Sequence, residues 1–280
     1  MTGTALIGQV EPPELHVMSF NIRRRLPQLG PFAGPRSADR WSVRAPAVAT
    51  LLQTERPALL GTQEALPDQD RALSAALGST YNRVGHGRDA DGQGEGCPLY
   101  YDSARLDLLR WSQVALSDTP DVDGSRSWGN LTPRVLVEAE LRDRTTGTRF
   151  LAVNTHFDNF SRRARVRSAE FVRLLVSDRG LPAVVTGDLN SGERTAPLTE
   201  LLAEGTLVDA WGAAEKRLTP EWGTFPNYRA PRLERKRIDW IAVTPDVRVE
   251  RIGLNARRPR GAWPSDHLPV QAVLRLPDPS

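Results

Sequence analysis

Acids, amides and imidazoles stand at the ends of several apolar, strand-like runs in this sequence. The short pieces that contain them are 19–23, 61–64, 154–156, 186–190, 237–240 and 264–269. Carboxylate and amide oxygens are ligands that suit a hard cation such as Mg²⁺. Imidazoles paired with carboxylates can donate and accept protons near neutral pH. This set of side chains indicates metal-assisted attack of water on a phosphate ester.

The elements that must position these side chains alternate between strands and helices. Apolar stripes at helical spacing predict helices over 41–55, 67–77, 162–176 and 197–203. Short apolar runs bounded by turn residues predict strands over 15–21, 58–61, 99–101, 106–117, 135–141, 150–156, 183–187, 238–243, 247–254 and 268–276. Three segments rich in Gly, Pro or charge, 24–40, 85–96 and 212–235, are expected to be loops.

No low-complexity linker or change of composition divides the chain. We expect a flexible segment over residues 1–14 and one domain over residues 15–277. The strand sets at 15–156 and 183–276 look loosely alike, and each begins with a strand that delivers polar groups. This likeness favours a four-layer α/β/β/α sandwich, in which two mixed β-sheets pack face to face between helices.

Composition limits the class of protein. The chain has 280 residues, of which 39% are hydrophobic and 25% are charged, as in ordinary globular domains. Cys97 is the only cysteine, so no disulfide can form within the chain. Residues 1–15 lack the pattern of a secretory signal, and no apolar run is long enough to cross a bilayer. We therefore expect a cytoplasmic protein that does not bind membranes.

The ordered pieces resemble the endonuclease/exonuclease/phosphatase superfamily over residues 15–276. Each piece alone is common, but six in the right order, each at a strand end, are specific. The similarity is greatest to uncharacterised bacterial members with Phe-Asn-Ile-Arg, Ser-x-Ser-Trp and Asn-Thr-His-x-Asp segments, here residues 20–23, 125–128 and 154–158. Arg23 stands where apurinic endonucleases of this superfamily have an acidic residue, so the resemblance disfavours an abasic-site enzyme.

The resemblance implies a metal site. Glu64 matches the principal Mg²⁺ ligand of the superfamily, Asp266 adds a second carboxylate, and Asn21 supports the site from the first strand. Mn²⁺ is expected to replace Mg²⁺. On the residues alone, Glu64 could also be a carboxylate at a helix N-terminus, and Asn21 could form a turn at a strand end.

The resemblance also implies catalytic roles. Asp188 would orient or deprotonate the attacking water, and Asn190 and His156 would hold the scissile phosphate. Because Asp188 and Asn190 are two residues apart, an extended segment would direct both to one side. Asp239 would keep His267 protonated, so that the imidazolium stabilises charge on the phosphoryl oxygens.

Arg134 matches a basic residue on the phosphate side of the site in superfamily members. A surface arginine at a strand edge is an equal alternative on the residues alone. The basic run 232–237 directly precedes Asp239 and could contact a polyanion.

The leading function expected from the sequence is a Mg²⁺-dependent phosphodiesterase or nuclease. Two alternatives stay open: a phosphomonoesterase acting on sugar or inositol phosphates, and a non-catalytic nucleic-acid-binding protein with the same fold. The pI of 9.4 motivates the last of these. The expected partner is a phosphate ester, with nucleic acid as one possibility, and the expected state is a monomer.

Overall fold

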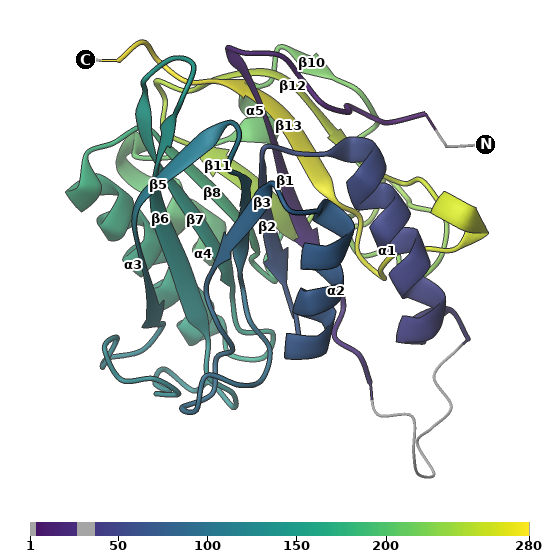
Figure 1. Cartoon of the computed structure of the whole chain (residues 1–280). Coiled ribbons are helices and arrows are strands. Elements are labelled where there is room, and N and C mark those ends of the chain that lie inside the picture. The colour runs from purple at the N-terminus through teal and green to yellow at the C-terminus, as the bar shows by residue number, and fades with distance from the viewer. Residues whose placement is uncertain (1–3, 27–36, 280) are drawn as a thin grey trace.

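Two β-sheets lie face to face with helices on their outer sides (Figure 1). The computed structural model describes residues 4–26 and 37–279. Part of the loop expected over 24–40 therefore lies outside the described residues. Within the described residues, no helix combines the length and apolar character that a membrane span needs.

The first sheet has seven strands, and two helices cover it. In sheet order its strands are β10 (Lys216–Arg217), β12 (Arg248–Leu254), β13 (Val270–Arg275), β1 (Glu14–Asn21), β2 (Leu59–Gln63), β4 (Leu99–Asp102) and β3 (Tyr81–Val84). Its helices are α1 (Trp41–Glu55) and α2 (Pro67–Leu77), each with the bounds expected from the sequence.

The second sheet has six strands, with helices on its own outer face. In sheet order its strands are β5 (Leu106–Ala115), β6 (Val135–Asp143), β7 (Arg149–His156), β8 (Ala183–Asp188), β11 (Asp239–Val243) and β9 (Val208–Asp209). Its helices are α3 (Arg162–Arg179) and α4 (Ala196–Leu201), and a one-turn helix, α5 (Ala210–Ala213), packs near β9, β11 and β12.

Three hydrophobic clusters correspond to the three interfaces between these layers. One lies between the sheets and includes Val17 and Val137, one lies under α3, and one lies under α1 and α2. Both sheets are mixed, because β1 and β2 are parallel and so are β7 and β8, among antiparallel neighbours. The predicted four-layer sandwich of two mixed sheets is confirmed.

The two sheets do not divide the chain into its two halves. Strands β5, β6 and β7 share a sheet with β8 and β11, whereas β12 and β13 share the other sheet with β1, and β13 pairs with β1 directly. Each sheet therefore contains strands from both sets, 15–156 and 183–276. The likeness between the two sets does not predict this mixing. Residues 6–8 of the expected N-terminal segment donate backbone hydrogen bonds to the buried carboxylate of Glu55.

Strand register brings the polar strand ends together. His156 at the end of β7 pairs with Asp188 at the end of β8, and Asp188 also pairs with Asp239 at the start of β11. In the first sheet, Asn21 at the end of β1 pairs with Gln63 at the end of β2. Both sheets therefore present their polar ends at one edge of the sandwich.

Candidate active site

A pocket of about 450 Å³ opens where the polar strand ends meet. Six of the eight acidic, amide and imidazole residues selected from the sequence line it, and so does Arg134. The six are Glu64, His156, Asp188, Asn190, Asp266 and His267. Asn21 and Asp239 are fully buried and contact the lining residues from beneath. The structure thus brings all nine predicted residues together.

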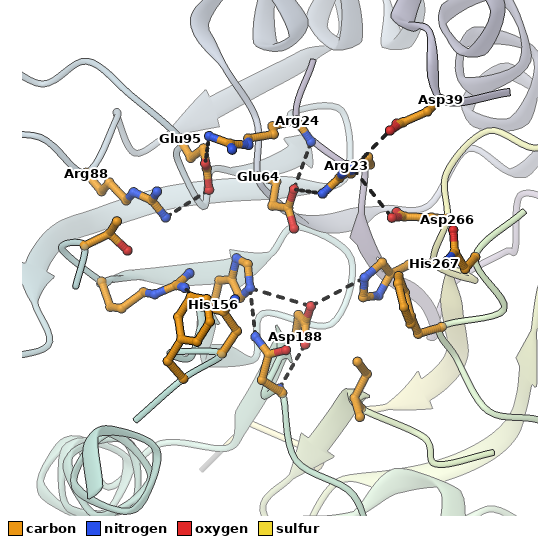
Figure 2. A pocket seen from close by; sticks show the side chains of 18 of the residues that line it. Arg23, Arg24, Asp39, Glu64, Arg88, Glu95, His156, Asp188, Asp266 and His267 are labelled. Carbon is orange, nitrogen blue, oxygen red and sulfur yellow. Dashed lines mark hydrogen bonds and ion pairs between the residues drawn. The ribbon is translucent and has the colours of Figure 1, made fainter. Parts of the chain in front are cut away.

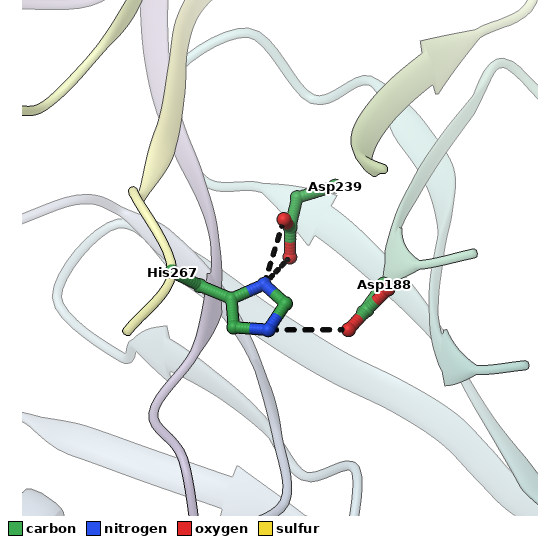
Figure 3. A group of neighbouring side chains, drawn as sticks. All are labelled: Asp188, Asp239 and His267. Carbon is green, nitrogen blue, oxygen red and sulfur yellow. Dashed lines mark hydrogen bonds and ion pairs between the residues drawn. The ribbon is translucent and has the colours of Figure 1, made fainter. Parts of the chain in front are cut away.

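Asp239, His267 and Asp188 form a buried line of charged groups on the pocket floor (Figure 3). His267 Nδ1 lies 3.1 and 2.9 Å from the two carboxylate oxygens of Asp239, and its Nε2 lies 3.8 Å from Asp188 Oδ2. Burial disfavours a charged imidazole, but the Asp239 carboxylate outweighs it and raises the pKa of His267 well above its ordinary value. The floor therefore holds a charged imidazole.

Asp188 is suited to accept a proton near neutral pH. Its burial and the nearby Asp239 carboxylate raise its pKa to about 7. Two donors fix its orientation: Asn21 Nδ2 donates to Oδ2 at 2.9 Å, and the backbone N–H of Asn190 donates to Oδ1 at 2.9 Å. One oxygen also faces His267.

His156 lies beside Asp188 on the other side from His267 (Figure 2), and Asn190 is hydrogen-bonded to both His156 and Asp188. Asn190 Nδ2 donates to His156 Nε2 at 3.0 Å and to the backbone oxygen of Phe157 at 3.0 Å. Burial and the charge of Arg134 lower the pKa of His156 well below its ordinary value, so this imidazole is neutral. Asn190 has a φ of 47°, so the segment after Asp188 turns into the left-handed region and is not extended as expected.

Glu64 and Asp266 face each other across the guanidinium of Arg23. Glu64 Oε2 lies 3.9 Å from Arg23 Nη1, and Asp266 Oδ2 lies 3.6 Å from Arg23 Nε. The backbone N–H of Arg24 also donates to Glu64 Oε2 at 2.9 Å. Glu64 directly follows β2 with a φ of 63° and precedes α2 by three residues, so it is not a capping residue of that helix.

These carboxylates fit the divalent cation that the superfamily resemblance implies. Their oxygens already converge on one cationic group, and hard cations take such oxygen ligands. Asn21 Nδ2 donates to Glu64 Oε1 at 3.0 Å, while its Oδ1 accepts from the backbone N–H of Arg23. Asn21 therefore holds the carboxylate in place, as expected of a supporting residue.

Asp188, Asp239 and His267 are a second group that could hold a metal. Each offers one ligand atom, and these atoms lie within 4.8 Å of one another. Both Asp239 oxygens already face His267 Nδ1, which leaves that carboxylate committed to the imidazole. The coordination chemistry therefore favours Glu64 and Asp266 for the cation.

Arg134 is a pocket residue and not a surface arginine at a strand edge. It is buried, its Nε lies 3.3 Å from Asp158 Oδ2, and its Nη2 donates to Asn159 Oδ1 at 3.0 Å. Its Nη1 is buried without a hydrogen-bond partner in the part of the chain that the structure describes. An unsatisfied guanidinium N–H in a pocket is suited to an anionic oxygen of a ligand.

Several pocket residues were not selected from the sequence. They are Arg23, Arg24, Asp39, Arg88, Glu95, Leu131, Phe160, Phe225 and Tyr228. Arg23 and Arg24 directly follow a strand-end motif, so their position was a usable signal. Arg88, Glu95 and Phe160 lie in loops without a local pattern, and only the fold brings them to the pocket.

Comparison with known proteins identifies the family. The model of the Endonuclease/Exonuclease/phosphatase family matches residues 18–267, and the chain belongs to this family. Proteins of this family are hydrolases that act on phosphate esters, so the chain is a phosphoesterase of this superfamily. No match was found among curated proteins.

Solved structures share the fold over almost the whole chain. A family member from Bacteroides thetaiotaomicron has 30% sequence identity and a TM-score of 0.86, with 95% of this chain and 99% of that chain covered. A mannosyl-6-phosphatase from the same organism has 31% identity and a TM-score of 0.83, with 93% and 99% covered. TDP2 from D. rerio, complexed with single-strand DNA product, has 16% identity and a TM-score of 0.64, with 94% and 99% covered, and shows the fold alone.

Proposed function

We propose that this protein is a divalent-metal-dependent phosphatase that transfers the phosphoryl group of a small phosphate monoester to water. The charge balance of the pocket carries this proposal. Four arginines and the charged His267 stand against five carboxylates, those of Asp39, Glu64, Glu95, Asp188 and Asp266. Among the residues that line the pocket, a bound divalent cation then leaves an excess of positive charge, which favours a dianionic phosphate monoester over a singly charged diester.

Glu64 and Asp266 would hold Mg²⁺, or Mn²⁺ in its place. A bound cation would neutralise part of the phosphate charge and polarise a phosphoryl oxygen. Arg23 lies between the same two carboxylates, so its guanidinium balances their charge beside the cation.

Asp188 would accept the proton of the attacking water. A pKa of about 7 leaves a substantial fraction of this carboxylate ionised at neutral pH, and the base is strong enough to take up a proton. The hydrogen bonds from Asn21 and Asn190 fix the carboxylate before substrate binds, which lowers the cost of orienting it for the reaction.

The remaining groups would bind the phosphoryl oxygens as negative charge develops on them. His267 is held as a cation by Asp239, and Arg134, which lines the same pocket, has an N–H without a partner among the described residues. Neutral His156 accepts from Asn190 and so orients that amide in the pocket. Such fixed donors stabilise a transition state more than a flexible solvent does.

A phosphodiesterase or nuclease, the leading expectation from the sequence, is the second candidate. Arg232, Arg235 and Lys236 are exposed on the loop before β11 and line two hollows apart from the candidate active site, a surface that suits a polyanion. The phosphatase is favoured because a neighbour with 31% identity is named a mannosyl-6-phosphatase, whereas the DNA-bound neighbour has 16% identity. The monomeric state and the cytoplasmic location expected from the sequence stay predictions.

Steady-state hydrolysis of two matched esters tests the proposal. With Mg²⁺ or Mn²⁺ present, kcat/KM for p-nitrophenyl phosphate should exceed kcat/KM for bis-p-nitrophenyl phosphate by about 100-fold. This ratio corresponds to about 2.7 kcal/mol of additional electrostatic stabilisation for the dianionic ester. The reverse preference would establish the phosphodiesterase instead. Hydrolysis of neither ester by metal-loaded protein would contradict both.

A further inference from the structure

Exposed apolar side chains gather at the mouth of an otherwise charged pocket. Among the described residues, nine large hydrophobic side chains are exposed, and three of them line this pocket: Phe160 at 70%, Leu131 at 65% and Phe225 at 42% exposure. Single exposed apolar residues are common on protein surfaces. Three at one charged pocket indicate contact with an apolar face of a ligand.

The backbone of Phe160 is hydrogen-bonded within the loop that contacts Arg134. Asp158 Oδ1 accepts hydrogen bonds from the backbone N–H groups of Phe160 at 2.9 Å and Ser161 at 2.6 Å. The other oxygen of Asp158 lies 3.3 Å from Arg134 Nε, and Asn159 also accepts from Arg134. The loop that positions Arg134 thus fixes the backbone of Phe160, and the Phe160 side chain lines the same pocket as Arg134.

A polar cluster of Arg24, Arg88 and Glu95, here called the Glu95 clamp, lies at one end of the same pocket (Figure 2). Arg24 Nη1 lies 3.1 Å from Glu95 Oε1, and Arg88 Nη1 lies 2.9 Å from Glu95 Oε2. A carboxylate with a guanidinium on each oxygen offers acceptors and donors side by side. Adjacent hydroxyl groups, each of which donates and accepts, complement that arrangement.

We propose that Phe160 and the Glu95 clamp form a subsite for the leaving group, and that this group is a sugar ring. The C–H face of the ring would lie on Phe160, and its hydroxyls would bind the Glu95 clamp. The phosphate would then reach Arg134 and His267, which line the same pocket. This inference presupposes the proposed phosphatase activity and names its substrate class.

Kinetics with ring and non-ring phosphates test the subsite. Wild-type protein should hydrolyse a hexose 6-phosphate with a lower KM than glycerol 3-phosphate. Phe160→Ala should raise the KM for the hexose phosphate about tenfold, the loss of one aromatic contact, and leave glycerol 3-phosphate unchanged. Phe160→Tyr should restore the wild-type KM, and Glu95→Gln should raise the KM for the hexose phosphate more than the KM for glycerol 3-phosphate.

Leu174→Ala is the matched control, because Leu174 is an exposed hydrophobic residue on α3 outside the pocket lining. It should change no parameter. Equal KM values for the two phosphates, or equal effects of Phe160→Ala on both, would overturn the sugar subsite while the phosphatase activity stands. A nucleoside 5′-monophosphate preferred over the hexose phosphate would overturn the sugar class. Hydrolysis of no phosphate ester would overturn the proposed function and the subsite together.

Discussion

Single residues in this site act through the charge of their neighbours. His267 is buried, yet the carboxylate of Asp239 keeps it positively charged. His156 is equally buried, and this burial together with the charge of nearby Arg134 lowers its pKa and keeps it neutral. The two buried imidazoles therefore differ in charge: His267 beside Asp239 is a cation, and His156 near Arg134 is neutral. This difference separates a group that stabilises negative charge from a group that orients Asn190.

The Asp239–His267 pair can be tested by removing charge without removing shape. Asp239→Asn should lower kcat by about 100-fold or more, because the imidazolium loses the carboxylate that stabilises it. Mn²⁺ affinity measured by calorimetry should change little, since both Asp239 oxygens face His267. Asp246→Asn, the same change at an exposed position, is the control. A near-normal kcat in Asp239→Asn would show that the pair is structural.

At the scale of elements, a buried arginine ties helix α1 to both halves of the site. Arg44 donates to the backbone oxygens of Ile22 at 2.6 Å, Arg23 at 3.0 Å and Asp39 at 3.1 Å, and lies 3.4 Å from that of Pro264. The oxygens of Ile22 and Arg23 belong to the segment after β1, and that of Pro264 belongs to the segment that leads into Asp266 and His267. The oxygen of Asp39 belongs to the turn before α1. Arg44 therefore links the two loops that extend beyond the paired ends of β1 and β13.

Arg44→Met should destabilise the fold by about 3 kcal/mol, because it leaves several buried carbonyls without a donor. It should also weaken Mn²⁺ binding, because Arg44 contacts both loops that position the proposed metal ligands. One loop contains Arg24, whose backbone N–H binds Glu64, and the other contains Asp266. Urea unfolding and calorimetric Mn²⁺ titration measure the two effects. Arg71→Met, at an exposed position on α2, should change neither. Normal Mn²⁺ affinity in folded Arg44→Met would confine the role of Arg44 to stability.

The sequence predicts elements and strand ends better than it predicts loops. Asn21, Glu64 and Asp188 end apolar strands, and such ends are visible in a one-dimensional pattern. Arg44 and Glu55 lie on the buried stripe of α1, and charged residues on an apolar stripe could have marked them as anchors. Glu95 and Phe160 could not be found in this way, because their positions depend on contacts with distant Arg24 and Arg134.

At the scale of the whole molecule, a second buried polar network lies away from the pocket. His16 on β1 has its Nδ1 2.8 Å from the backbone oxygen of Gly8, to which it donates, and its Nε2 accepts from Gln271 of β13. Glu55 of α1 accepts from residues 6–8 and from Asn255. This network connects the N-terminal segment to the first sheet and to α1, and the histidine in it, His16, is neutral.

Acid should weaken the fold through His16. Burial lowers the pKa of His16 to about 4, whereas an unfolded chain takes up this proton near pH 6.5. The unfolded state therefore binds more protons as the pH falls from about 6.5 to 4, and stability is lost over that window. Between pH 7.5 and pH 5 the loss from this group should be about 2 kcal/mol.

Urea unfolding of wild type and His16→Gln at pH 7.5 and pH 5 measures this contribution. The variant is expected to start from lower stability but to lose about 2 kcal/mol less between the two pH values. His86→Gln, a change in the loop after β3, should keep the wild-type pH dependence. The same pH dependence in His16→Gln would show that His16 is not the group responsible.

Metal dependence of phosphate-ester hydrolysis tests the proposed metal site most directly. After treatment with EDTA, the protein should hydrolyse p-nitrophenyl phosphate only when Mg²⁺ or Mn²⁺ is added back, and the rate should saturate with metal concentration. Glu64→Gln should abolish this activation within the same concentration range, whereas Glu11→Gln at an exposed position should retain it. Hydrolysis that survives both EDTA and the Glu64→Gln substitution would contradict the proposed metal site and the mechanism built on it.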